Sequence, residues 1–304
     1  MKRIVALVLV LILALSVFAG CGSKEKDYTL SIGVVVTEGL AKNKITQTVA
    51  AVVTDAEGKI VACRLDCVDY TAKYTDGALD TKFPSSKVAL GENYGSMPAG
   101  TWSVQGAALE EYVVGKTQTE VAAIAVDNSG KITDADLKAS CSIAVTDLLK
   151  AIDNAFKSEH KVAFKASADA LTAGLASVGT VKDSSKDASK NVKESATYAA
   201  VVLADGAVVA AILDTAEPEL VGITDDGAAS LNYKGTKREQ GEKYDSYSPM
   251  PAGTWYVQAD VYAATAVGKT ASDIATLATE GVAGCTISVT AYKSAIEAAV
   301  KAAR

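Results

Sequence analysis

The chain has 304 residues and an acidic balance, because 36 Asp and Glu against 30 Lys and Arg give a formal net charge of -6. This charge argues against nucleic acid as a partner, since phosphate backbones are bound by basic patches. Only one histidine, His160, is present, so a Ser-His-Asp or Cys-His catalytic arrangement is not expected.

The first residues follow the plan of a bacterial export signal. Lys2 and Arg3 precede an apolar run over residues 4–19, and Phe18-Ala19-Gly20-Cys21 places small residues before a cysteine. This segment resembles the lipobox of bacterial lipoproteins, whose cysteine carries lipid after cleavage. We therefore predict a signal peptide over residues 1–20, a lipid anchor with palmitate-type chains on Cys21, and a place on the outer side of the cell membrane. The alternative, a transmembrane helix, needs about 20 apolar residues, and this run ends earlier.

An internal duplication organises the rest of the chain. Met97-Pro98-Ala99-Gly100-Thr101-Trp102 recurs as Met250-Pro251-Ala252-Gly253-Thr254-Trp255, 153 positions later (250 − 97). Val114-Gly115-Lys116-Thr117 recurs as Val267-Gly268-Lys269-Thr270 at the same spacing (267 − 114). A repeat at fixed spacing indicates duplicated structural units. We predict module 1 over residues 28–157, module 2 over residues 175–304, and a helical or flexible connector over residues 158–174.

Each module is predicted to hold the same elements in the same order. A strand (48–54; 198–203) leads through a Gly-containing turn, which accommodates positive φ, into a second strand (59–65; 207–213). A helix follows the Trp motif (108–114; 259–267) and ends at Gly115 or Gly268. Capping boxes begin the next helix at Thr117 and Thr270. A last strand (142–145; 286–289) leads into a helix with Thr146 or Thr290 as its N-cap. The fold class is α+β, as two tandem repeats, each a small antiparallel sheet with packed helices.

Three motifs allow both a functional and a structural interpretation. Val-Gly-Lys-Thr suggests a phosphate loop, but the first Gly of that pattern is Glu110 or Ala263 here, so a helix stop is favoured. Asp66 with Asp69 could act as an acid–base pair, with an exposed strand edge as the simpler interpretation. A repeated Trp is more often a core anchor than a stacking platform. The aromatic residues weighed in this way are Trp102, Trp255, Tyr94, Tyr112, Tyr247 and Tyr262.

Four cysteines remain beyond Cys21, namely Cys63, Cys67, Cys141 and Cys285. Export permits disulfides, but Cys63 and Cys67 are four positions apart on a predicted strand, about 13 Å apart along it and beyond disulfide reach. Free, buried thiols are the default, and the disulfide state stays open. No cysteine pair has zinc-ligand spacing, so no metal site is predicted.

One segment of module 2 carries a family resemblance. Ala283-Gly284-Cys285-Thr286 before a capped helix resembles the Ser-Gly-Ala-Thr region of FMN-binding domains. The hairpin over residues 49–65 and the helix over residues 291–303 resemble that family's opening and closing elements. The resemblance implies FMN joined to Thr286 through its phosphate, with Gly284 admitting the phosphate and Ser142 as the counterpart in module 1. This chain departs from the family pattern at Ala283 and Cys285.

Two functions are compatible with this sequence. A lipid anchor with two such modules resembles the flavinylated lipoproteins that carry electrons outside Gram-positive cells, and also two-module lipoproteins of gut Firmicutes. The first hypothesis is a surface-anchored, non-hydrolytic binding or structural protein that keeps the FMN-binding-like scaffold. The alternative is a covalently flavinylated electron carrier with an external redox partner. The sequence identifies neither the surface ligand nor that redox partner.

Overall fold

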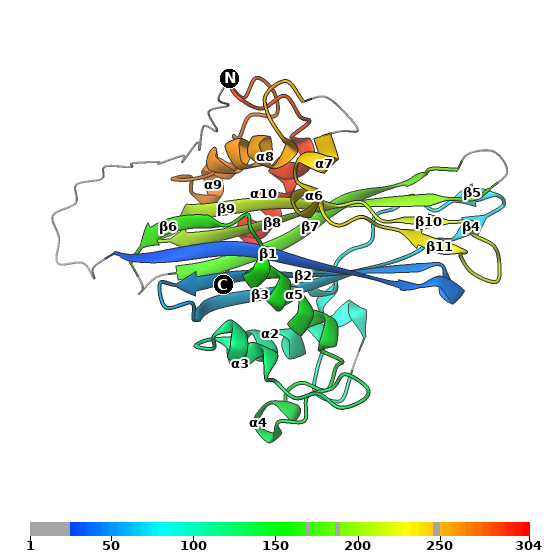
Figure 1. Cartoon of the computed structure of the whole chain (residues 1–304), viewed down its shortest axis with the longest axis horizontal. Coiled ribbons are helices and arrows are strands. Elements are labelled where there is room, and N and C mark those ends of the chain that lie inside the picture. The colour runs from blue at the N-terminus through cyan, green and yellow to red at the C-terminus, as the bar shows by residue number, and fades with distance from the viewer. Residues whose placement is uncertain (1–24, 96, 168–170, 186–188, 246–249) are drawn as a thin grey trace, which may run out of the picture.

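Two antiparallel sheets stacked face to face form the centre of the protein, with helices on both outer sides (Figure 1). The computed structural model describes residues 25–95, 97–167, 171–185, 189–245 and 250–304. The predicted signal peptide and Cys21 therefore lie outside the described residues, as does Tyr247. No helix in the described ranges is long and apolar enough to cross a membrane. The predicted α+β class is confirmed.

Each sheet is built around long, apolar strands. The first has the order β3-β2-β1-β6 and holds β1 (Lys26–Gly39), β2 (Lys44–Asp55), β3 (Ile60–Thr71) and β6 (Val162–Ala166). The second holds β7 (Leu171–Asp183), β8 (Val192–Ala204), β9 (Ala207–Ala216), β10 (Glu219–Val221) and β11 (Ser230–Asn232), with β8 between β7 and β9. A small hairpin joins β4 (Tyr74–Thr75) to β5 (Ala78–Leu79).

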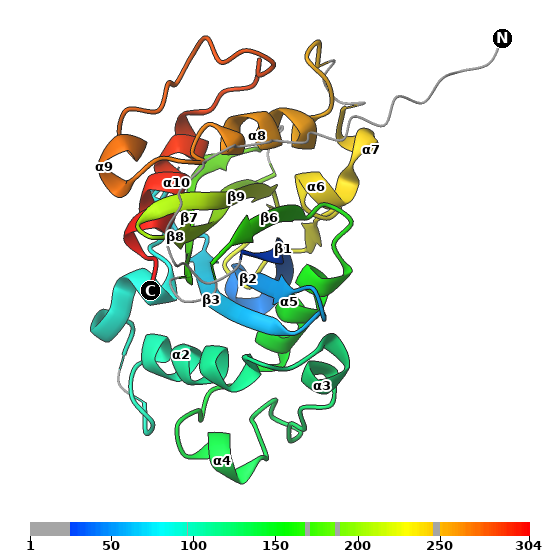
Figure 2. The same ribbon diagram turned by 90° about the vertical axis from the view of Figure 1, so that its left-hand side faces the viewer.

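The helices divide between the two outer faces, as Figure 2 shows end-on. The first sheet carries α1 (Lys87–Leu90), α2 (Trp102–Val113), α3 (Gln118–Ala122), α4 (Ala135–Lys138) and α5 (Thr146–Lys157). The second sheet carries α6 (Lys237–Gln240), α7 (Glu242–Asp245), α8 (Trp255–Ala264), α9 (Ala271–Ile274) and α10 (Thr290–Lys301). Short 3-10 turns lie at Leu40–Lys42 and Gly91–Tyr94.

The two halves use corresponding packing between strand and helix. We call residues 26–157 the first half and residues 171–304 the second half. Helix α5 packs on β1 and β2, and α10 packs on β7 and β8. A glycine permits the close approach in each case. A Cβ at Gly33 would lie 2.1 Å from the carbonyl oxygen of Ala151, and one at Gly174 would lie 1.9 Å from that of Ala299. Any side chain there would force the helix away from the sheet.

Three sequence predictions about these elements are wrong. The predicted connector is partly strand, since β6 pairs with β1 and β7 begins at Leu171. The last strands predicted for the modules do not form: residues 286–289 contain no strand, and of residues 142–145 only Ala144 makes a single bridge, to Lys131. Thr146 and Thr290 are the first helical residues, with Val145 and Val289 at the N-cap positions. These segments are fixed by tertiary contacts, which outweigh local propensity.

Candidate functional site

The repeated Met-Pro-Ala-Gly-Thr-Trp motif forms a turn that starts a helix in each half. The Gly100 N–H donates to the Met97 carbonyl (3.0 Å), and the Gly253 N–H donates to the Met250 carbonyl (3.2 Å). Both glycines have positive φ, +99° and +107°, which favours glycine over any other residue. The helix starts at the Trp itself, earlier than predicted, and both Trp side chains are buried in the core, as predicted.

The Val-Gly-Lys-Thr motif ties the end of that helix to the start of an edge strand. The Gly115 N–H donates to the Ile60 carbonyl (2.7 Å), and the Ile60 N–H donates to the Lys116 carbonyl (2.9 Å). Gly268, Lys269 and Val208 make the same two bonds in the second half, at 2.8 and 2.9 Å. The predicted capping boxes at Thr117 and Thr270 follow directly. In the first half the motif directly follows α2, which ends at Val113. In the second half α8 already ends at Ala264, four positions before Gly268, so the predicted helix end at Gly268 is wrong. In both halves the motif clamps the edge strand.

The residues predicted for FMN are held by a buried glutamine. The backbone N–H and the hydroxyl of Thr286 both donate to the Gln258 side-chain oxygen, at 2.7 and 3.0 Å. Ser142 makes the same two bonds to Gln105, also at 2.7 and 3.0 Å. Thr286 is exposed, and Gly284 two positions before it has a φ of +78°. Ser142 and Thr286 are thus structural counterparts. A phosphoester on Thr286 would remove the hydroxyl proton that Gln258 accepts.

A matched cluster of a lysine, a carboxylate and two aromatic rings lies on the outer side of each sheet. The Lys87 ammonium is 3.3 Å from an Asp69 oxygen and lies over the rings of Tyr94 and Trp102, at 5.0 and 5.7 Å from their centroids. The counterpart in the second half is Lys237, which is 3.1 Å from Glu217 and lies over Tyr244 and Trp255 at 4.8 and 5.5 Å from their centroids. The side chains of Lys87 and Lys237 are largely buried, at 13% and 12% exposed.

Each carboxylate of these clusters has a second lysine. Lys44 lies 3.0 Å from Asp69, and Lys193 lies 2.8 Å from Glu217. Burial works against the charged form of Asp69 and Glu217, but the neighbouring lysines outweigh it and hold the pKa of both carboxyls below their usual values. Burial likewise opposes the charged form of Lys87, and its negative and aromatic neighbours outweigh this and raise its pKa. The clusters are therefore charged and internally paired.

A buried aspartate on each edge strand holds the short helix that carries this lysine. Asp66 accepts the N–H groups of Cys67 (2.8 Å) and Val88 (3.1 Å). Asp214 accepts those of Thr215 (2.7 Å) and Arg238 (3.2 Å). Burial raises the pKa of both carboxyls to about 6, against the hydrogen bonds that favour the charged form. The interpretation of Asp66 as part of an exposed strand edge is wrong, since it is buried.

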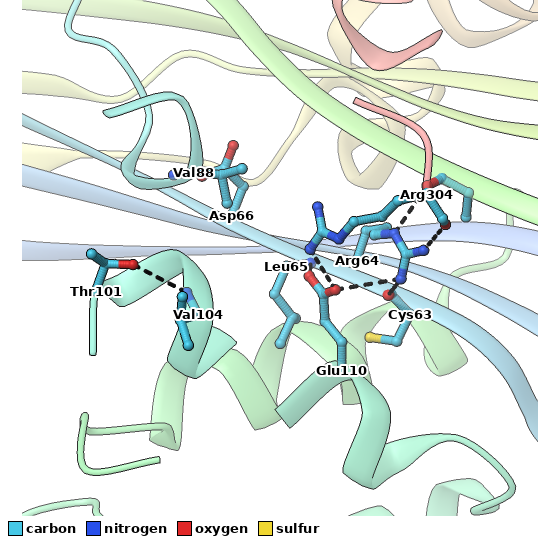
Figure 3. A network of polar contacts seen from close by, with 10 residues as sticks. Cys63, Arg64, Leu65, Asp66, Val88, Thr101, Val104, Glu110 and Arg304 are labelled. Carbon is cyan, nitrogen blue, oxygen red and sulfur yellow. Dashed lines mark hydrogen bonds and ion pairs between the residues drawn. The ribbon is translucent and has the colours of Figure 1, made fainter. Parts of the chain in front are cut away.

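The first half adds a polar network that joins it to the end of the chain (Figure 3). Glu110 is buried, accepts the Leu65 N–H at 2.8 Å, and pairs with Arg64 and Arg304 at 3.4 and 2.7 Å. Arg64 also donates to the Ala173 carbonyl (2.9 Å) and to the carbonyl of Arg304. The position of Glu110 corresponds to Ala263 in the second half. This network is therefore an asymmetric tie between β3, α2, β7 and the C-terminal residue.

The cysteines stay free and mostly buried in the structure. Cys63, Cys67 and Cys141 are buried, and Cys285 is partly exposed, with no disulfide among the four. Burial raises the pKa of the Cys67 thiol to about 11, so this thiol is a poor nucleophile. No group of three or more His, Cys, Asp or Glu side chains suited to a metal ion occurs in the described part of the chain.

The described residues line surface hollows in both the first half and the region between the halves. One, of about 390 Å³, is lined by residues of the first half that include Tyr112, Lys116 and Asp134. The other, of about 510 Å³, lies where the two halves meet and is lined by residues that include Val34, Asn154, His160, Asp214 and Arg238. Ligand sites favour such boundaries between structural units.

Comparison with protein-family models, with curated proteins and with solved structures found no match for this chain. The matched clusters were absent from the predictions made from sequence. A signal for them exists, because Ser86-Lys87 and Thr236-Lys237 are 150 positions apart (237 − 87), near the motif spacing of 153. The three-residue difference hides the pairing from a search at fixed spacing.

Proposed function

We propose that this protein is a duplicated, lipid-anchored surface protein of two FMN-binding-like modules that acts by binding or by structural support and performs no hydrolysis. The leader pattern that ends at Cys21 supports the anchor. The corresponding clusters, clamps and glycine contacts of the two halves support a duplication. The acidic charge of the chain supports a partner other than nucleic acid.

The observation that carries the proposal is that the residues repeated in the two halves have structural roles. The turn glycines, the buried Trp residues and the Lys–carboxylate clusters all build the scaffold, and the lysine and carboxylate of each cluster are paired with each other. Groups that are paired inside a scaffold are stabilising elements and are poorly placed to take protons from a substrate. These structural roles agree with a protein that functions through contacts made by its surface.

A second candidate is the flavinylated electron carrier, and one observation favours it. Thr286 and Gly284 are both exposed on the same loop, and Gly284 has a positive φ of +78°. The Ser142 loop lacks a glycine at the corresponding position, where Ser140 stands. If flavin is carried, it belongs to the second half.

One preparation tests the anchor and the flavin together. The protein is isolated from the membrane fraction of its own cells, and intact and peptide masses are measured. The binding proposal expects diacylated Cys21 and an unmodified peptide containing Thr286. A flavin mass on that peptide, lost in Thr286→Ala and kept in Ser142→Ala, would instead establish the carrier. A Cys21→Ala variant that remains equally membrane-bound, with its leader removed, would refute the anchor.

A further inference from the structure

The chain enters the fold at one end of the two stacked sheets. β1 begins at Lys26, directly after Glu25, the first residue that the structure describes. Beside that start lie the last residue of β6, Ala166, which pairs with Lys26, and the turn that joins β2 to β3. The turn that joins β8 to β9 lies at the same end of the second sheet (Figure 1). We call this region the near end, and it comprises residues 25–27, 55–59, 165–166 and 204–207.

The near end is a short covalent distance from the predicted lipid anchor. Four Cα-to-Cα steps (25 − 21) separate Cys21 from Glu25, and these steps span at most about 14 Å. At the other end of the first sheet, residues 40–43 join β1 to β2, and we call this turn the far end. β1 is 14 residues long, so the far end is roughly 45 Å away at about 3.3 Å per residue. An anchor on Cys21 therefore keeps the near end, and not the far end, within reach of the bilayer surface.

The layers outside β1 oppose an arrangement in which the tethered protein lies flat. β1 belongs to the central layers, with helices outside its own sheet and the second sheet with its helices on the other side (Figure 2). A helix with its side chains is about 10–12 Å thick, and stacked sheets are about 10 Å apart. To rest on the helices of the second half, the protein would need a tether of at least about 20 Å. The four steps between Cys21 and Glu25 are too short for this.

Charge opposes contact with the membrane through the helices of the first half. From the start of α1 to the end of α5, nine Asp and Glu stand against six Lys, and the negative potential of anionic headgroups repels such a surface. At the near end, by contrast, two exposed ion pairs join charges of opposite sign. Lys165 lies 3.0 Å from Asp27, and Lys59 lies 3.3 Å from Glu57. These pairs reduce the repulsion between the near end and anionic headgroups.

We infer that the lipid anchor holds the near end against the phospholipid headgroups, so that the two sheets stand upright on the bilayer and the far end points away from it. The inference rests on the proposed anchor at Cys21 and adds to it the surface that faces the membrane. The far end, and not the near end, is then the part of the chain that a partner outside the cell meets first.

The experiment places one fluorescent probe at either end of β2. The lipidated protein is purified from the membranes of its own cells as Cys285→Ser, which leaves the other free cysteines buried. Ala56→Cys then provides a thiol at the near end and Lys42→Cys provides one at the far end, both at exposed positions. β2 between them is 12 residues long, roughly 40 Å. The labelled proteins are reconstituted into vesicles of phosphatidylcholine and phosphatidylglycerol, with or without a quenching nitroxide on the headgroups.

We expect the headgroup nitroxide to remove most of the emission at position 56 and almost none at position 42. A flexible insertion of about twenty Gly and Ser residues after Ser23, which reaches roughly 25 Å, should relieve most of the quenching at position 56. The reason is that the longer tether no longer holds the near end at the headgroups. Lys42→Cys with the same insertion is the matched control and should stay unquenched.

Equal quenching at the two positions, stronger quenching at position 42, or undiminished quenching at position 56 in the protein with the insertion would each overturn the inference. Flotation with the vesicles is measured first and separates these results from a failure of the proposed anchor. Protein that does not float refutes the anchor and the orientation together, whereas protein that floats with the wrong quenching pattern refutes the orientation alone.

Discussion

The outer faces of the two sheets resemble each other closely, whereas their inner faces do not. On the outer side, Lys87 with Asp69 corresponds to Lys237 with Glu217, at 3.3 and 3.1 Å. On the inner side, three positions of β2 correspond in register to unlike residues of β8, at an offset of 149. The pairs are Ile45 with Glu194, Gln47 with Ala196, and Val49 with Tyr198.

The difference follows from what each face must contact. Each outer face packs against its own helices, so both halves can use the same contacts between sheet and helices. The inner faces pack against each other, so each must complement the other and need not copy it. Here Tyr198 donates to the Gln47 side-chain oxygen across the sheets, and Glu194 is buried close by. The Tyr198 hydroxyl and the Gln47 side-chain oxygen are therefore partners across the two sheets.

The largest effects should come from the buried Trp residues, which test the similarity of the outer faces. Trp102→Ala and Trp255→Ala should each lower the free energy of unfolding by about 3–5 kcal/mol, through lost burial and a cavity. Trp255→Ala should cost more, because the Trp255 indole N–H donates to the Tyr292 hydroxyl at 2.9 Å. Urea unfolding measures both. The exposed Val257→Ala serves as control and should change stability by less than about 0.5 kcal/mol. A large loss in one half only would mean that the outer faces are built differently.

Much of this outer-face architecture could be predicted from the sequence. The hairpin turns, the helix stop at Gly115 and both capping boxes depend on local residues, and the structure contains them. The helix stop predicted at Gly268 is wrong, because α8 ends at Ala264. The strands β1 and β7 escaped prediction because glycine, serine and threonine interrupt their apolar pattern, and Gly33 and Gly174 are explained only by a helix above them. The hollow of about 510 Å³ and the polar pair of Tyr198 and Gln47 depend on how the two halves meet. No local pattern encodes that arrangement.

The next prediction tests the asymmetry of the inner faces through Glu194. Burial raises its pKa from 4.5 to about 8, with a smaller opposing effect of Gln47. Between pH 4.5 and about pH 8, Glu194 therefore stays protonated in the folded chain but is ionised in the unfolded chain. The Glu194 contribution is fully present below pH 4.5 and is lost as the pH rises to about 8.

Glu194→Gln should remove this loss. Between pH 5 and pH 8, the free energy of unfolding should decrease less for this variant than for the unchanged chain. The two decreases should differ by a few kcal/mol. Denaturant unfolding at both pH values measures the difference. Asp66 and Asp214 also titrate in this range. Because both residues are present in the variant and in the unchanged chain, their contributions cancel when the two pH profiles are compared. The exposed Glu242→Gln should keep the original pH dependence. Identical pH profiles for Glu194→Gln and the unchanged chain would show that Glu194 is charged in the fold.

Glycine contacts beneath the helices give a smaller effect and test whether the halves pack alike. Gly33→Ala and Gly174→Ala would place Cβ atoms 2.1 and 1.9 Å from backbone oxygens of α5 and α10. Each should cost about 1–3 kcal/mol by overpacking, measured by urea unfolding. Gly39→Ala is the control, since its nearest contact would be a Lys44 side-chain carbon at 3.3 Å, and it should be nearly neutral. If only one of the two strand glycines is sensitive, helix and sheet are spaced differently in the two halves.

The smallest effect concerns the loops held by Gln105 and Gln258. Ser142→Ala and Thr286→Ala each remove one hydroxyl bond to a glutamine oxygen, while the backbone N–H bond to the same oxygen remains. The loss should be about 0.5–1.5 kcal/mol in both variants. Gln258→Ala should cost more, because it also leaves the Thr286 N–H and the Gly253 carbonyl without their partner. An equal and small cost for the two hydroxyls would show that the loops serve the same structural purpose. A Thr286 variant that loses far more than Ser142→Ala would point to a bound group on the second half alone, which is where the exposed loop glycine lies.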